Sequence, residues 1–238
     1  RGQYLLDVGR ADVQAYLAAT LDRLVDECAP DYIKWDMNRD YAQVGAASAS
    51  SALAMTRGWM ALAEALRKRH PQIVLELCGA GGARSDAGAM CLADRLWPTD
   101  SIDPVQRFGV LRHAGLLLPA ARLGWHIGAA PAHTSGAAHP VSTRCLLALL
   151  GHPGLEVNPA LLTAQERGTI QRSVAVYKAH REWLADAEPS WLDTLPGEAQ
   201  ALLLHAEAAG KALLMLVQPT YPQRGSTPRV RLPTLHAQ

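Results

Sequence analysis

Three short stretches of the chain place carboxyl groups where a strand-like run gives way to a loop. They are DYIKWDMNRD at residues 31–40, ELCGAGGARSDAG at residues 76–88 and LWPTDSID at residues 96–103. Hydrolysis of a glycosidic bond uses two carboxyl groups on opposite sides of a pocket. One attacks the anomeric carbon, and the other protonates the leaving oxygen and then activates water. Asp36 and Asp100 are the candidates for such a pair, although spacing alone does not establish it.

Strand alternation divides the first stretch into two faces. Lys34, Asp36 and Asn38 point one way, and Ile33 and Trp35 point the other. A lysine beside an aspartate favours the ionised carboxylate that a nucleophile requires. A buried structural Lys–Asp ion pair explains the same pattern equally well.

The second and third stretches carry further polar groups. Glu76 and Cys78 share one face of their strand, and Glu76 is either a second barrel acid or a core ion-pair partner for Lys34. The glycines that follow would let a ligand approach the backbone closely. Asp103, which precedes Pro104, has the pattern of a helix N-cap with proline at the first helical position, a structural role.

The elements that must position these groups alternate along the chain. Apolar periodicity predicts helices over about 11–28, 50–69, 104–116 and 164–184, and strands at 32–37, 72–78 and 95–97 and near 117–126 and 154–157. This alternation predicts a parallel α/β barrel, whose catalytic groups gather at the carboxyl ends of the strands. A hairpin is expected around Gly210, within 201–218. We therefore expect a partial barrel over 1–187 and a β-rich domain over 188–238, cut short.

Composition sets limits on function. The 238 residues carry a formal charge of +1 and are 49% hydrophobic, which is typical of a soluble globular protein and indicates neither nucleic-acid nor membrane partners. The four cysteines lack zinc-site spacing, so buried free thiols and no metal are expected. Free thiols and the absence of a signal peptide favour the cytoplasm. Because the chain starts without Met, we expect it to be a piece of a longer protein.

The quoted stretches resemble the motifs of one enzyme family in the family's own order. YIKWDMNR resembles the nucleophile motif of the glycoside hydrolase family 36 α-galactosidases. ELCGAGGARSDAG resembles the family's glycine-rich Cys loop, and LWPTDSIDPVQR resembles its Trp-Thr-Ser-Asp-x-x-Asp segment. RGQYLLD at the start of the chain and APAHTSG, with His133, match two further stretches. Together these motifs cover most of residues 1–184.

The resemblance implies an α/β fold, a (β/α)8 TIM barrel whose first strands precede this chain, followed by an antiparallel β domain. It implies retaining hydrolysis of raffinose-type α-1,6-galactosides without a cofactor, with Asp36 as nucleophile and Asp100 as acid/base. The two carboxyl groups of a retaining enzyme lie about 5–6 Å apart. The residues that the resemblance assigns to galactose binding are Arg1, Lys34, Asn38, Cys78 and Gly81.

The resemblance also leads to expectations about the whole protein, and this sequence differs from the family pattern at some positions. It implies a homo-oligomer, commonly a tetramer, and it implies that the isolated segment is unstable or inactive because the barrel would have open sheet edges. Leu77 and Thr99 replace serines that are usual in the family, which leaves substrate preference open. α-N-Acetylgalactosaminidase activity and galactosyl transfer are the minority options within the family.

Two alternatives come from other classes. A non-catalytic or degenerate sugar-binding relative would have no need of the opposed pair Asp36 and Asp100. A barrel lyase or isomerase would use Lys34 as a Schiff base, and borohydride would then trap its substrate on Lys34.

Overall fold

A computed structural model describes residues 5–38, 51–192, 199–219, 230 and 232–233 of the chain. The chain divides into two compact units, Arg1–Asp100 and Ser101–Gln238, and each unit is described by itself.

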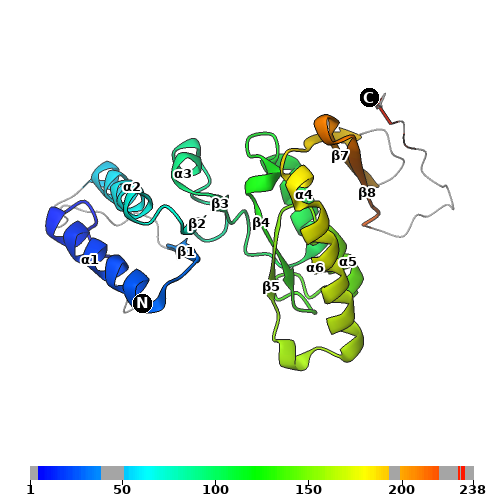
Figure 1. Cartoon of the computed structure of the whole chain (residues 1–238), viewed down its shortest axis with the longest axis horizontal. Coiled ribbons are helices and arrows are strands. Elements are labelled where there is room, and N and C mark those ends of the chain that lie inside the picture. Colours follow the sequence, from blue (N-terminus) through cyan, green and yellow to red (C-terminus); the bar gives the residue numbers. More distant parts are fainter. Residues whose placement is uncertain (1–4, 39–50, 193–198, 220–229, 231, 234–238) are drawn as a thin grey trace. The chain divides into compact units, whose positions relative to one another are not determined.

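The first unit alternates helices with parallel strands (Figure 1). Its elements are α1 (Ala11–Cys28), β1 (Tyr32–Asp36), α2 (Ala52–Arg69), β2 (Val74–Cys78), α3 (Ala87–Leu92) and β3 (Arg95–Leu96). The three strands form one parallel sheet in the order β1-β2-β3. Because all three run the same way, their carboxyl ends meet at one edge of this sheet.

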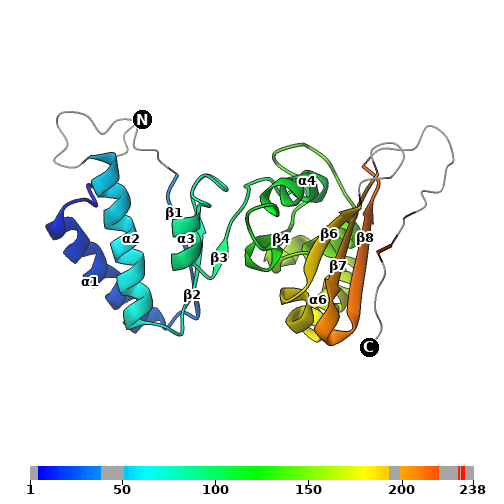
Figure 2. The same ribbon diagram turned by 90° about the horizontal axis from the view of Figure 1, so that it is seen from above.

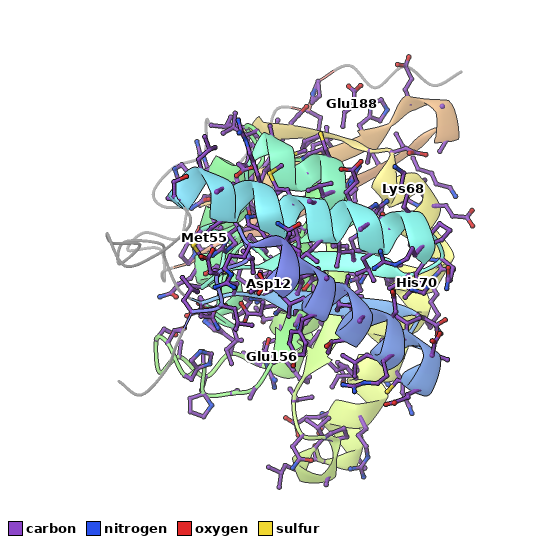
Figure 3. The ribbon with its side chains drawn as sticks, turned by 90° about the vertical axis from the view of Figure 1, so that its left-hand side faces the viewer. Asp12, Met55, Lys68, His70, Glu156 and Glu188 are labelled. Atoms are coloured by element: carbon purple, nitrogen blue, oxygen red, sulfur yellow. The ribbon has the colours of Figure 1, made fainter. Side chains whose placement is uncertain are left out.

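Apolar stripes explain how this unit packs. The side chains of Met55, Leu62 and Leu66 on α2 are buried, as are Leu75 and Leu77 on β2. α2 begins where the Ser51 hydroxyl accepts a hydrogen bond from the Ala54 N–H at 3.2 Å, and it ends in the basic sequence Arg67-Lys68-Arg69. Figure 3 shows α1, which carries Asp12, side by side with α2, which carries Met55 and Lys68.

The second unit continues the helix–strand alternation and then changes character (Figure 2). Its first elements are α4 (Pro104–Ala114), η1 (Ala120–Arg122), β4 (Gly124–Gly128), α5 (Val141–Ala148), β5 (His152–Glu156), η2 (Pro159–Leu161) and α6 (Ala164–Ala185). β4 and β5 pair in parallel. β6 (Glu188–Leu192), β7 (Gln200–Ala206), η3 (Glu207–Ala209) and β8 (Lys211–Val217) follow, and the three strands form an antiparallel sheet in the order β6-β7-β8.

The expected elements are present, with shifted ends. The hairpin of β7 and β8 is confirmed, and Gly210 at its turn has a φ of 59°, a conformation that glycine adopts readily. α3 and α5 were not expected, and the strand expected near 117–126 lies instead at Gly124–Gly128. The first antiparallel strand begins at Glu188, and the domain boundary after residue 187 stays a prediction.

Two sequence expectations concern the chain as a whole. All four cysteines are free, but only Cys78 and Cys145 are buried; the expectation that Cys28 and Cys91 are buried is wrong, because each lies on the exposed side of a helix. None of the helices in the described part of the chain has the length and apolar character of a membrane span.

Candidate active site

The candidate residues gather where the strands of the first unit end. Asp36 is the last residue of β1 and lies opposite Cys78, the last residue of β2. Asp100 follows β3 by four residues. The structure therefore assigns all three to the carboxyl-end edge of one parallel sheet, the edge at which barrel enzymes place their catalytic groups.

Asp36 is held from two sides. Asn38 donates from Nδ2 to Asp36 Oδ2 at 3.0 Å, while Asn38 Oδ1 accepts a hydrogen bond from the Ala80 N–H at 2.8 Å. The Cys78 thiol is hydrogen-bonded to the Asp36 carboxyl group as well. The pKa of Cys78 is raised to about 11, mainly by burial and to a smaller extent by this hydrogen bond. The thiol therefore stays protonated and donates to the carboxylate.

Lys34 makes its ion pair with Glu76 rather than with Asp36. Its Nζ atom lies 3.9 Å from Glu76 Oε1, and the Glu76 side chain is only 1% exposed. The two residues face each other in the register of β1 and β2. Of the two readings of Glu76, the core ion-pair partner is the one that the structure supports. Burial and then the negative charge of Glu76 raise the pKa of the neighbouring Tyr32.

The glycine-rich loop after β2 lies against the backbone that carries Asp100. Gly81 has a φ of 75°, and a Cβ atom placed on it would lie 3.1 Å from Thr99 Cα and 3.2 Å from the Asp100 nitrogen. A Cβ atom on Gly82 would lie only 2.6 Å from the Pro98 carbonyl oxygen. The glycines are needed because the two backbones touch. The loop thus links the Asn38 end of the site to Asp100.

Asp100 receives a hydrogen bond from a buried tryptophan. Trp97 Nε1 donates to Asp100 Oδ1 at 3.0 Å, and the Trp97 side chain is 2% exposed. The face of the same ring lies 4.0 Å, measured to its centroid, from Lys34 Nζ. Sequence reasoning gave Trp97 no role of its own, although Trp97 matches the tryptophan of the Trp-Thr-Ser-Asp-x-x-Asp segment.

The remaining candidate residues have separate outcomes. Asp103 caps α4, as expected: its Oδ1 atom accepts hydrogen bonds from the N–H groups of Val105 and Gln106 at 2.9 and 3.3 Å. Ser135 donates to the other Asp103 oxygen at 2.6 Å. Arg1, assigned to galactose by the family resemblance, lies outside the described residues.

Comparison with known proteins decides the family. A sequence model of the melibiase family matches residues 1–187, which is most of the chain. The chain belongs to the melibiase family.

Curated melibiase relatives cover nearly the whole chain. An α-galactosidase of Escherichia coli is 31% identical over 220 residues, covering 88% of this chain and 31% of the relative. The bifunctional α-galactosidase/sucrose kinase AgaSK of Mediterraneibacter gnavus is 32% identical over 234 residues, covering 98% of this chain and 25% of the relative. The chain thus spans about a quarter to a third of the length of these melibiase relatives.

Solved melibiase structures share the fold. The galactosidase domain of AgaSK matches with a TM-score of 0.90 at 28% identity, covering 99% of this chain and 34% of that one. A variant of AgaA, a family 36 α-galactosidase from Geobacillus stearothermophilus solved with stachyose, matches with a TM-score of 0.91 at 26% identity, covering 98% and 33%. The predicted fold class, a (β/α)8 TIM-barrel segment followed by antiparallel strands, is confirmed.

Proposed function

We propose that the intact protein is a retaining α-galactosidase that releases terminal α-D-galactosyl residues from raffinose-type α-1,6-galactosides. The observation that carries the proposal is the meeting of Asp36, Cys78 and the Asp100 segment at one sheet edge. The family supports it, since its curated relatives are α-galactosidases and two AgaA variants were solved with stachyose and raffinose.

In the first step the carboxylate of Asp36 attacks the anomeric carbon of the galactosyl group. The bond from that carbon to the leaving oxygen breaks, and Asp100 gives its proton to this oxygen. A covalent galactosyl ester on Asp36 results. In the second step Asp100, now a carboxylate, takes a proton from water while the water oxygen attacks the anomeric carbon and the ester bond to Asp36 breaks. Each step inverts the configuration at the anomeric carbon, so the two steps together retain it.

The groups around Asp36 prepare it for attack. Asn38 and Cys78 both donate to its carboxylate, which fixes the direction of its oxygens. Lys34 lies on the same face of the strand, where its ammonium group can donate to a sugar hydroxyl. The glycines of the β2 loop let its backbone pack directly against the backbone of the Asp100 segment, which holds the acid/base segment beside this loop.

Azide rescue of two variants of the intact protein tests both roles. We expect Asp36→Ala and Asp100→Ala each to lower turnover at least about hundredfold. Azide would rescue Asp36→Ala by direct displacement and give the β-galactosyl azide. It would rescue Asp100→Ala on an activated substrate by attack on the covalent intermediate and give the α-galactosyl azide. Near-normal turnover by either variant would overturn the assignment.

A further inference from the structure

Trp97 contacts two charged residues of the candidate site, Asp100 and Lys34. Its indole N–H donates to Asp100 Oδ1 at 3.0 Å, and its ring face lies 4.0 Å from Lys34 Nζ. The Trp97 side chain is 2% exposed, so its N–H and ring are shielded from bulk water, while its partners Asp100 and Lys34 lie on the exposed side of the site.

The backbone at Trp97 is held as firmly as the side chain. Its N–H donates to the Leu77 carbonyl oxygen at 2.9 Å, which ties the segment to β2. The next residue is Pro98, and a residue before proline is restricted to extended backbone. The indole therefore reaches Asp100 from a fixed point on the barrel wall rather than from a free loop.

We propose that Trp97 is a positioning residue for the acid/base carboxyl group, and that it places the catalytic proton on Asp100 Oδ2. This inference rests on the proposed function of Asp100. An indole N–H donates and never accepts. The carbonyl oxygen of a carboxylic acid is a better acceptor than its hydroxyl oxygen, so when Asp100 is protonated this hydrogen bond favours Oδ1 as the carbonyl oxygen and the proton on Oδ2. The same hydrogen bond stops rotation of the carboxyl group, so one orientation of the acid is selected before the substrate arrives.

The ring face of Trp97 makes a second contact, separate from the hydrogen bond that its edge donates to Asp100. The ammonium group of Lys34 lies over the ring at a distance typical of a cation–π interaction. Lys34 is anchored in turn by Glu76 at 3.9 Å. A displaced Trp97 would thus disturb Lys34 as well as Asp100, and a test must separate the lost N–H from the lost ring.

Trp97→Phe in the intact protein makes that separation, because phenylalanine keeps an aromatic face for Lys34 and removes the N–H donor. Trp125→Phe is the matched control. Trp125 lies on β4 and is also 2% exposed, so this variant removes the same atoms from a buried tryptophan outside the candidate site. Each variant is assayed on raffinose, whose leaving group needs a proton, and on 2,4-dinitrophenyl α-galactoside, whose leaving group does not. The readout is the ratio of the two kcat/KM values, which cancels the concentration of folded enzyme.

We expect Trp97→Phe to lower kcat/KM on raffinose about tenfold, the effect of losing one hydrogen bond to a carboxyl group, and to leave the dinitrophenyl substrate within about twofold. Trp125→Phe should leave the ratio unchanged. An unchanged ratio in Trp97→Phe, including equal and complete loss on both substrates, would overturn the inference and make Trp97 structural. Failure of the wild-type protein to hydrolyse either galactoside would instead overturn the proposed function itself.

Discussion

Lys34 on β1 and Glu76 on β2 lie opposite each other in the parallel register, with Nζ and Oε1 3.9 Å apart. The Glu76 side chain is 1% exposed, and that of Lys34 is 30% exposed. The lysine therefore has its counter-charge in the core, while Asp36 is held by Asn38 and Cys78. This separation frees Asp36 to act as a nucleophile without serving as the lysine's structural partner.

Removing the buried member of this pair should destabilise the intact protein. We expect Glu76→Leu to lower the free energy of unfolding by about 1–2 kcal/mol, because it leaves the Lys34 ammonium group, which is 30% exposed, without its counter-charge. The measurement is the denaturation midpoint in urea. Lys34→Met/Glu76→Leu is the control, since it removes both charges and should recover part of the loss. If Glu76→Leu unfolded at the wild-type urea midpoint, the ion pair would make no net contribution to the free energy of unfolding.

The contact between the glycine-rich loop and Asp100 should be essential for turnover. We expect Gly81→Ala to lower kcat/KM about hundredfold, because the new Cβ would lie 3.1 Å from Thr99 Cα and displace the acid/base segment. Gly136→Ala is the matched control: its φ of 73° gives similar strain, but its Cβ would meet no atom of the described residues within 4 Å. Equal kinetic effects of the two variants would show that strain, and not the contact, is responsible.

The Cys78 thiol should make stability depend on alkaline pH. Its pKa is raised from the ordinary value of 9.0 to about 11, so the folded state prefers the protonated thiol. The associated stabilisation is complete below about pH 9 and is lost as the pH rises through about 11. We expect the thermal midpoint of the wild type to fall more steeply over this range than that of Cys78→Ser, which has no thiol to titrate. The pKa of Tyr32 is raised mainly by burial and by Glu76, which both proteins share, so most of its effect cancels in the comparison. Parallel curves would contradict the prediction.

Strand periodicity predicted the part of the site that lies on β1. Tyr32, Lys34 and Asp36 are exposed and Ile33 and Trp35 are half-buried, as alternation requires. It could not decide between the two partners of Lys34, because the residue opposite Lys34 depends on how β1 and β2 pair in space and not on either strand's own sequence.

Short elements and loop contacts were the hardest to predict. α3 spans six residues after a glycine-rich loop, and α5 spans eight and has no side-chain N-cap hydrogen bond, so neither shows the long apolar periodicity that identifies a helix. The hydrogen bond from Trp97 to Asp100 depends on the backbone path through Pro98 and Thr99, which no periodic pattern encodes.

The central claim is that Asp36 is the nucleophile, and covalent trapping tests it most directly. The intact protein is incubated with an activated 2-fluoro α-galactoside, digested with trypsin and analysed by tandem mass spectrometry. We predict a fluorogalactosyl adduct on the peptide WDMNR, residues 35–39, localised to Asp36, and no adduct in Asp36→Asn. An active enzyme that carries the label on another residue, such as Glu76 or Asp100, would contradict the account.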